Sequence, residues 1–431
     1  MATFVAKISS MGLKKYKLGE LIEVTRGATL SGQYYSTEGE LIRLTLGNFN
    51  MNGGGWKTNT SKDDLYFTGN VKEEFILNKG DIITPLTEQS LGLLGTTARI
   101  PEGGKYIQSQ DVALVKCKED MIDENFCYYL ISSNLVRQQL SAAAQQTKIR
   151  HTSPDKIKDC TVWIPELPTQ EKIGRILTDL DSKIQLNREL NQNLEAMAKQ
   201  LYDYWFVQFD FPNEEGKPYK SSGGKMIYNA KLKREIPETW NVIPLFQGVD
   251  VQYGFPFSTD LFTEQQTDIP VVRIRDILNG SVSAYSNEDI EDKYQLNKED
   301  LLIGMDGNFH MNYWHNDTAY LNQRSVRLRA KSNSSISIMQ TMYDLKPYIK
   351  AKEENAKGST VGHLSDKDLK GLFLIVANET NIFKPRSIFD YIISNIIANR
   401  VEIESLTKQR DELLPLLMNG QVEVNSDLSH G

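Results

Sequence analysis

Residues 167–210 read LPTQEKIGRILTDLDSKIQLNRELNQNLEAMAKQLYDYWFVQFD, and this stretch determines how the rest of the chain is organised. Apolar residues recur in it every three or four positions, which is typical of a long helix that pairs with another helix. Asn187 and Asn191 interrupt the apolar seam, and a polar Asn in such a seam often fixes the register of the pair. The spacing therefore predicts a helix that begins near Thr169. The apolar positions that define this helix are Ile173, Ile176, Leu177, Leu180, Ile184, Leu190, Leu194, Met197 and Leu201.

The same pattern recurs 212 positions further along the chain, where His363 aligns with His151. Segments 148–201 and 360–413 align without a gap and share 11 identical residues in 54. The second segment predicts a helix of its own, with Asn399 in the seam. Because both seams share one offset, we predict that the two helices pair in an antiparallel arrangement; the alternative is that each packs on a separate domain core. The apolar positions of the second seam are Ile388, Phe389, Ile392, Ile396, Ile403, Leu406 and Leu413.

Shorter matches precede each predicted helix. LGELIEVTRG (18–27) resembles LFQGVDVQYG (245–254), and NKGDIITP (78–85) resembles NKEDLLIG (297–304). These stretches are rich in apolar and β-branched residues and are bounded by turn residues, which is typical of strands. The predicted fold is therefore α+β: two similar α/β domains separated by two long helices that form an antiparallel coiled coil, an internal repeat with pseudo-two-fold symmetry. The predicted boundaries are 1–166 for the first domain, 167–210 for the central helix, 211–382 for the second domain, and 383–431 for the C-terminal helix and tail.

Each half also contains an H-x-S motif that is better explained by helix capping than by catalysis. Ser153 precedes Pro154, and proline is favoured at the first helical position. Ser365 to Asp368 has the Ser-x-x-acid form of a capping box. We therefore predict structural roles for His151 and His363.

The predicted helix length suggests a type of ligand. A helix over residues 169–206 would be roughly 55 Å long at about 1.5 Å per residue. Two similar domains held apart by a rigid spacer suit a ligand with two half-sites. DNA is the common ligand of this kind, with half-sites about one helical turn, ~34 Å, apart.

The composition predicts neither a membrane span nor a secretory signal. The chain has 431 residues, 40% of them hydrophobic and 24% charged, and no apolar run approaches the roughly 18 residues of a membrane span. The N-terminus has no apolar signal region, and three cysteines without CxxC spacing suit a reducing compartment, so we expect a cytoplasmic protein. The formal net charge of −7 argues mildly against a free nucleic-acid binder, although a partner that supplies positive charge would offset it.

Recognisable catalytic motifs are missing from the sequence. It contains no GxxxxGK[ST] phosphate loop, no glycine-rich dinucleotide fingerprint after a strand, and no GxSxG nucleophile motif. His310 and His315 lie near Asp306 and Asp317, but their spacing matches no standard set of metal ligands. We therefore predict no catalytic residue, no metal and no cofactor in this chain.

Segments rich in basic and amide side chains occur in both halves. LNQRSVRLRAKSN (321–333) and AAAQQTKIRHTS (142–153) contain no acidic residue. Arg and Lys suit guanine edges, and Asn and Gln suit adenine edges; the alternative for each segment is a solvated surface. The candidate DNA-binding residues are Gln89, Ser90, Gln108, Gln110, Gln146, Lys148, Arg150, Asn308, Gln323, Arg324, Arg327, Lys357 and Thr360.

The first helix ends in a dense aromatic cluster just before Pro212. One interpretation is that the rings pack the helix against the adjoining domain. The other is that they form a docking surface for a partner subunit, since large aromatic residues are enriched in interface cores. The candidate docking residues are Tyr204, Trp205, Phe206 and Phe209.

With these motifs in place, the chain resembles the DNA specificity subunits of type I restriction–modification enzymes. The resemblance covers nearly the whole chain. It is carried by LPTQ (167–170), by LDSKI (180–184) with Asn187, by WFVQFD (205–210), and by GGKM (223–226) and EIPETW (235–240). The second helix departs from the pattern, because VANETNIFKPRSIFDYI (376–392) lacks the LP-x-Q entry.

The resemblance implies a non-catalytic recognition protein. Each domain would read one half of an asymmetric, two-part sequence in double-stranded DNA, and the helices would set the gap between the halves. Two methyltransferase subunits, which bind S-adenosylmethionine, would dock on this subunit. Two motor–nuclease subunits, which use ATP and Mg, would join in complexes that also cut DNA.

Two other functions compete with this one. The first is an enzyme, such as a stand-alone methyltransferase or nuclease, and the missing cofactor and metal motifs speak against it. The second is a coiled-coil adaptor or a DNA-mimic interaction protein that recognises no target. Its acidic composition would suit a mimic, whereas the basic segments would not.

Overall fold

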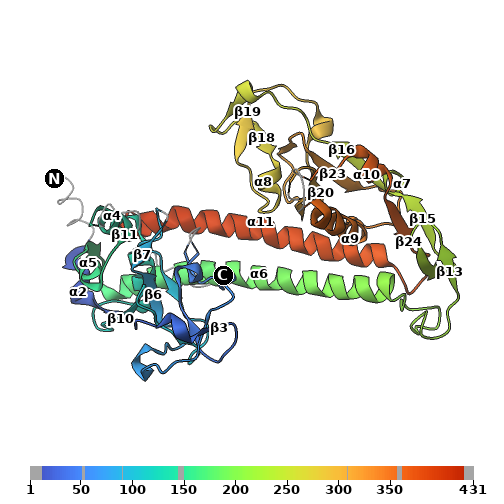
Figure 1. The fold of residues 1–431 in the computed structure, drawn as a ribbon. Helices are drawn as coiled ribbons and strands as arrows, with labels where there is room; N and C mark the ends of the chain where they lie inside the picture. The colour runs from blue at the N-terminus through green and yellow to red at the C-terminus, as the bar shows by residue number, and fades with distance from the viewer. Residues whose placement is uncertain are drawn as a thin grey trace. The chain divides into compact units, whose positions relative to one another are not determined.

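The structure is a computed structural model of the whole chain. It describes residues 12–50, 54–89, 91–143, 150–307, 309–356 and 362–421. The chain divides into two compact units: unit 1 comprises Met1–Lys183 and Leu406–Gly431, and unit 2 comprises Ile184–Ser405. Each unit combines helices with sheets, which confirms the predicted α+β class (Figure 1). Within the described ranges, no helix is both long enough and apolar enough to cross a membrane.

Unit 1 is built on two four-stranded sheets with the orders β2-β10-β6-β8 and β3-β5-β4-β9, together with the antiparallel pairs β1–β12 and β7–β11. Its strands are β1 (Lys14–Lys17), β2 (Ile22–Arg26), β3 (Tyr35–Ser36), β4 (Ile42–Arg43), β5 (Tyr66–Phe67), β6 (Ile82–Pro85), β7 (Thr87–Glu88), β8 (Ala98–Arg99), β9 (Tyr106–Ile107), β10 (Val112–Cys117), β11 (Arg150–His151) and β12 (Thr161–Ile164). Its shorter helices are α2 (Leu18–Leu21), α3 (Glu124–Ser132), α4 (Asn134–Ala143) and α5 (Pro154–Lys158).

Unit 2 repeats this arrangement, with the sheet orders β16-β23-β20-β21 and β17-β19-β18-β22 and the pair β15–β24. Its strands are β13 (Met226–Asn229), β14 (Arg234–Pro237), β15 (Asn241–Pro244), β16 (Val249–Tyr253), β17 (Phe262–Thr263), β18 (Ile269–Val272), β19 (Ala284–Ser286), β20 (Leu301–Gly304), β21 (Met311–Tyr313), β22 (Tyr320–Leu321), β23 (Ser325–Ala330) and β24 (Phe373–Val376). Its shorter helices are α7 (Leu245–Gly248), α8 (Ile274–Ile277), α9 (Ile338–Ala356) and α10 (Asp366–Lys370). The matching strand orders confirm the predicted internal repeat.

The short helices α5 and α10 begin as the sequence predicts. The Ser153 side chain accepts a hydrogen bond from the Lys156 amide, with Pro154 at the start of the helix. Ser365 and Asp368 form a reciprocal capping box, in which each side chain accepts a hydrogen bond from the other residue's amide. Both serines therefore satisfy backbone donors that would otherwise lack a helical partner.

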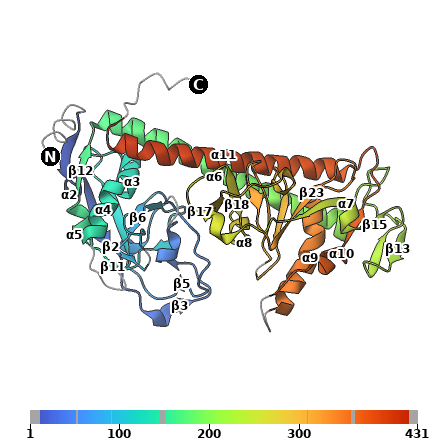
Figure 2. The same ribbon diagram turned by 90° about the horizontal axis from the view of Figure 1, so that it is seen from above.

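Two long helices, α6 (Leu167–Tyr202) and α11 (Pro385–Met418), contain residues of both units and run side by side (Figure 2). In unit 2 the Asn399 amide donates a 2.9 Å hydrogen bond to Asn191 Oδ1, and the Asn187 amide donates one to Glu402. In unit 1 Asp181 pairs with Arg410 at 2.8 Å. The residue numbers of these partners increase along α6 while they decrease along α11, so the helices are antiparallel. The polar residues predicted to lie in the seam are thus confirmed there.

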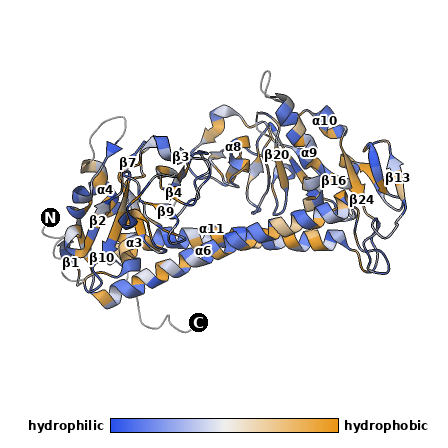
Figure 3. Cartoon of the chain, turned by 60° about the horizontal axis from the view of Figure 1, so that its bottom comes forward, coloured by the Kyte–Doolittle hydropathy of each residue, from blue (hydrophilic) through white to orange (hydrophobic). Residues whose placement is uncertain are grey.

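Part of the predicted apolar seam is wrong. Leu190 and Met197 are exposed, and Ala198, which lies one residue after Met197, is buried instead. Figure 3 shows the resulting mixture of apolar and polar residues along both long helices. The shift follows from the 3.6-residue period, because a seam that passes through Asn187 and Asn191 turns Leu190 and Met197 onto another face.

The aromatic end of α6 belongs to the core of unit 2. After Tyr202 the helix continues as one wider π-helical turn, Asp203–Val207. Trp205, Phe206 and Phe209 are buried among apolar residues of unit 2, and the Trp205 ring meets those of Phe383 and Phe389 edge to face. These three residues are therefore corrected from docking candidates to core residues, because no partner could reach their rings. Tyr204 alone of the four is exposed.

Candidate nucleic-acid interface

In each unit, one glycine at the end of a strand allows two loops to cross at close range. A Cβ atom on Gly27 would lie 2.2 Å from the Gln108 carbonyl oxygen, and one on Gly254 would lie 2.0 Å from the Asn322 carbonyl oxygen. Any other residue would collide with the backbone there. The crossing places Gln110 in unit 1 and Gln323 in unit 2 just before the equivalent strands β10 and β23, with both side chains exposed. These two predicted candidates therefore occupy matching positions.

Two other candidates are structural residues. Gln108 is 1% exposed, and its amide donates hydrogen bonds to the Thr25 and Val112 carbonyls at 2.8 and 3.1 Å. Arg327 is 4% exposed and forms an ion pair with Asp250 on the neighbouring strand β16. Burial lowers the pKa of the Arg327 guanidinium, although nearby carboxylates oppose this shift. We withdraw both from the candidate interface, since neither can reach a base without leaving the fold.

Arg150, on β11, also has a structural role, because it supports the loop that follows β7. Its guanidinium lies 3.1 Å from Oε1 of Glu88, a side chain that is 2% exposed. Oε2 of Glu88 accepts hydrogen bonds from the amides of Gly92, Leu93 and Leu94. Arg150 therefore neutralises a buried carboxylate that shapes the loop, and a buried acid needs such a partner. The shaped loop leaves Gln89 exposed, which keeps this residue among the candidates.

Arg324 stands at the surface of unit 2 in an unusual backbone conformation. Its φ of +67° lies in the left-handed region, which is strained for a residue with a Cβ and often marks a ligand site. The Arg324 side chain is 61% exposed, and its guanidinium lies 3.5 Å from Asp306. Asp306 also meets His363 Nδ1 at 2.5 Å. A carboxylate thus holds an exposed arginine in position.

A basic depression surrounds Arg324 and contains several residues that the sequence did not single out. It is lined by Arg273, Ile274, Arg275, His310, Asn322, Gln323 and Arg324, with no acidic residue among them. Arg275 is the most exposed of its measured cations, with 67% of its side chain accessible. The sequence signal for Arg275 is RIRD (273–276), which has two arginines directly after β18. This motif lies outside the basic segments 142–153 and 321–333. Asp276 and Asp306 lie beside these arginines. The lining itself presents cations and amides, which provide the chemistry for contacts to phosphates and base edges.

The turn that carries Arg275 has a counterpart in unit 1 with different side chains. Thr45 precedes a short helical turn and its amide donates to Asn48 Oδ1 at 2.9 Å, while the Arg273 amide donates to Asp276 Oδ2 at 3.0 Å. The position of Arg275 within this turn corresponds to Gly47. The same capped turn therefore presents the cation of Arg275 in unit 2 and no side chain, at Gly47, in unit 1.

Six of the candidates cannot be placed. Ser90, Gln146, Lys148, Asn308, Lys357 and Thr360 lie outside the described residues. Their assignment to the interface stays a prediction from the sequence.

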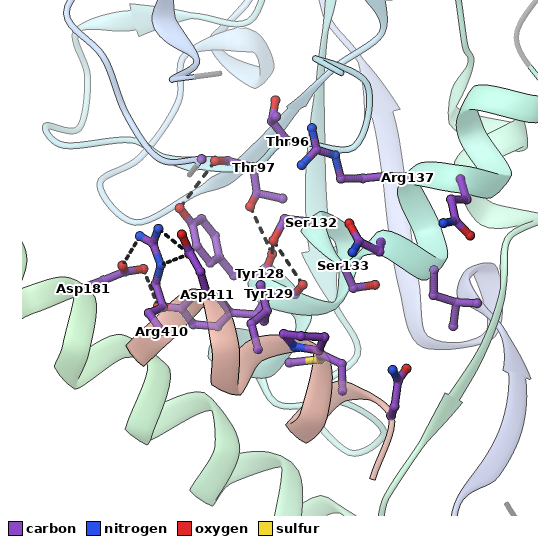
Figure 4. A pocket seen from close by; sticks show the side chains of 18 residues that line it. Thr96, Thr97, Tyr128, Tyr129, Ser132, Ser133, Arg137, Asp181, Arg410 and Asp411 are labelled. Atoms are coloured by element: carbon purple, nitrogen blue, oxygen red, sulfur yellow. Dashed lines mark hydrogen bonds and ion pairs between the residues drawn. The ribbon is translucent and has the colours of Figure 1, made fainter. Parts of the chain in front are cut away.

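A cavity of about 510 Å³ in unit 1 is lined by charged, hydroxyl and amide side chains together with apolar ones (Figure 4). Arg410 lies between Asp181 and Asp411 at 2.8 and 2.7 Å, and the Tyr129 hydroxyl donates a hydrogen bond to Asp181. Burial raises the pKa of Tyr128 to about 12, so its hydroxyl keeps its proton at neutral pH. Asp181, Arg410 and Asp411 thus pair with one another, and the Asp181–Arg410 pair joins α6 to α11.

Histidine and cysteine side chains are the other groups in the described part of the chain that could carry chemistry. No cluster of three or more His, Cys, Asp or Glu side chains there could hold a metal ion. His315, one of the histidines considered from the sequence, instead meets Glu404 of α11 at 3.2 Å. Burial raises the pKa of the Cys160 thiol to about 11, which keeps it protonated and unreactive.

Comparisons with known proteins agree on one family. A family model described as "Type I restriction modification DNA specificity domain" matches residues 11–196 and 237–381. The MjaIX specificity subunit of a type I restriction enzyme from Methanocaldococcus jannaschii is 24% identical over 322 residues, which cover 71% of each chain. The EcoBI specificity subunit from Escherichia coli is 31% identical over 140 residues, 32% of this chain and 29% of the relative. The crystal structure of a type I restriction–modification S subunit from M. genitalium has a similar fold, with a TM-score of 0.57 at 16% identity over 94% of this chain and 96% of that one.

Proposed function

Because the chain belongs to the family of type I restriction–modification DNA specificity subunits, we propose that it reads a two-part DNA sequence, with one half contacted by each unit. Members of this family are the non-catalytic recognition subunits of their complexes, so the chain is not itself the enzyme. The two halves of the target would differ, because the surfaces that meet them differ. The target is therefore proposed to be asymmetric.

The observation that carries this proposal is the pair of equivalent turns at Thr45–Asn48 and Arg273–Asp276. Their backbones are held by the same amide-to-side-chain hydrogen bond. Only the turn of unit 2 presents exposed arginine, at Arg275. A guanidinium can donate two hydrogen bonds to a guanine edge, and glycine cannot. Two turns with the same backbone but different exposed side chains suit two half-sites of different sequence.

The basic depression also favours DNA binding over DNA mimicry. A mimic would present carboxylates in place of phosphates, whereas the residues that line the depression include three arginines and no acid. The net charge of −7 belongs to the chain as a whole, and local clusters of cations can still attract phosphates. Methyltransferase subunits would supply further positive charge around the duplex.

An exposed apolar stripe on α6 and the turn that follows it supports docking of a methyltransferase subunit. Leu186, Leu190, Met197 and Tyr204 are 54%, 43%, 44% and 40% exposed. Spacings of four and seven residues place them on one helical face, distinct from the seam with α11. Exposed apolar stripes of this kind are typical of protein interfaces. The proposed complex has two methyltransferase subunits, which bind S-adenosylmethionine, and it gains two motor–nuclease subunits with ATP and Mg when it cuts DNA.

The test is a domain exchange followed by methylome sequencing. Replacing residues 14–165 with the corresponding segment of another specificity subunit should change one half of the methylated motif and leave the other half intact. A strain without the gene gives the background, and an exchange of the corresponding segment of unit 2 gives the matched control. A motif in which both halves change, or neither does, would contradict the proposal.

A further inference from the structure

Unit 2 contains a groove that the proposed DNA contacts do not use. It lies among the end of α6, the β13–β14 hairpin, α9 and β24, and its volume is about 790 Å³. Figures 1 and 2 place α8, which carries Arg275, at the opposite end of unit 2 from β13. The groove and the basic depression are therefore separate surfaces of the same unit.

Positive charge dominates the lining of this groove. Its cations are Lys199, Lys231, Arg234, Lys346 and Lys350, and its carboxylates are Asp203 and Asp344. Lys199 pairs with Asp203, and the Asp344 carboxylate accepts a 2.7 Å hydrogen bond from the Tyr202 hydroxyl. Among the described residues, Lys231 and Lys346 have no carboxylate partner, and Lys350 lies 3.9 Å from Glu354. The groove thus holds more cations than its own acids can neutralise.

Apolar surface lies between these cations. Val207 is 48% exposed, and Pro347 on α9 is also exposed. Leu232 and Phe373 are half-buried in the wall of the groove. A phosphate backbone would satisfy the lysines but would leave this apolar surface in water. A peptide that carries both acidic and apolar side chains would cover both.

We propose that this groove binds an acidic segment of the methyltransferase subunit, one in which Asp or Glu side chains flank apolar residues. The inference rests on the proposed function, because it takes the methyltransferase subunit as the partner. The acidic side chains would pair with Lys231, Lys346 and Lys350 at the rim, and the apolar ones would lie against Val207 and Phe373. The groove would be a second contact beside the apolar stripe of α6, on another face of that helix.

Photo-cross-linking of the reconstituted complex tests the occupant. A photo-reactive amino acid replaces Val207 in the full chain, which is then assembled with its methyltransferase subunit and with DNA. The expected product joins position 207 to a methyltransferase peptide that contains several Asp or Glu residues. The control places the same amino acid at Tyr228, which is 67% exposed but does not line the groove. A cross-link to DNA, a cross-link to a segment without acids, or no cross-link in the assembled complex would each overturn the inference.

Charge reversal provides the matched measurement of affinity. Lys231→Glu, Lys346→Glu and Lys350→Glu together should weaken association with the methyltransferase subunit by roughly tenfold or more, with a reduced dependence on salt. The control is Lys220→Glu, Lys367→Glu and Lys384→Glu, three exposed lysines of unit 2 outside the groove with the same change in net charge. Equal affinities for the two triple variants would refute the groove. If the unaltered complex methylates no specific motif, the proposed function fails instead, and the two outcomes are distinguishable.

Discussion

Replacing Trp205 by alanine should destabilise unit 2 strongly, because the ring is part of its core. Trp205 is 7% exposed and meets the rings of Phe383 and Phe389 at centroid distances of 5.4 and 5.8 Å. Truncation of a buried aromatic residue typically costs about 3–5 kcal/mol, since it removes apolar contacts and leaves a cavity. Tyr204→Ala is the control, because Tyr204 is 40% exposed and a change there should alter the free energy of unfolding by no more than about 0.5 kcal/mol.

Native-state hydrogen exchange followed by mass spectrometry measures the loss of stability in Trp205→Ala for each unit separately. At about 1.4 kcal/mol per factor of ten, protection of the β23 amides in unit 2 should fall roughly 100- to 4000-fold in Trp205→Ala. The β10 amides of unit 1 provide an internal reference that should change little. Unchanged protection of β23, combined with loss of binding to the methyltransferase subunit, would refute the packing role and restore Trp205 as a docking residue.

Three further outcomes are expected. Arg275→Ala and Arg324→Ala should each weaken DNA binding and reduce the slope of log affinity against log salt by about 1 if the residue meets a phosphate; an unchanged slope and affinity would remove the depression from the interface. Asn191→Leu combined with Asn399→Leu should leave the helix pair as stable or more stable but allow alternative registers, which spin-label distances would reveal as a broadened distribution; a single sharp distance would contradict this role. Burial raises the pKa of Asp344 from 3.8 to about 6, above its unfolded value, so the stability present below pH 4 should be lost, by roughly 3 kcal/mol, as pH rises through about 6. Urea unfolding from pH 4 to 7 should show this fall in the original protein and a flatter profile in Asp344→Asn.

The features that sequence predicts well here are those with a strong local signal. The two long helices follow from their periodicity, and the caps at Ser153 and Ser365 follow from short motifs whose hydrogen bonds lie within a few residues. The repeat follows from a constant offset. The helices and their caps depend on neighbours in the sequence, so tertiary packing had little opportunity to override them. The pairing of the helices is long-range, and it follows from the offset that the two seams share.

Contact residues are harder to predict, because composition does not determine which way a side chain points. Arg324 and Arg327 belong to one basic segment, yet Arg324 is exposed before β23 while Arg327 is buried within the strand against Asp250. The basic segment around Arg150 predicts a DNA contact, whereas the structure places its guanidinium beside Glu88, which is 62 positions earlier in the chain. Burial and long-range pairing are tertiary properties. The composition of a loop therefore predicts where candidate contacts lie but not which of its side chains are exposed.

The backbone contacts that hold the two crossing loops do not involve the side chains exposed on those loops. This arrangement explains how such a protein could change its target without losing its fold. In both units the loop crossing depends on a glycine. The residue two positions after that crossing is held through its backbone: the Leu86 amide donates to the Asp111 carbonyl, and the Met305 amide donates to the Arg324 carbonyl, both at 2.8 Å. Neither bond uses a side chain, so Asp111 and Arg324 can carry opposite charges at matching positions. Substitution at such a position changes the chemistry of the surface but leaves this backbone hydrogen bond in place. Changes of specificity should therefore cost little stability, in contrast to changes at Gly27 or Gly254, where any side chain would push the two loops apart.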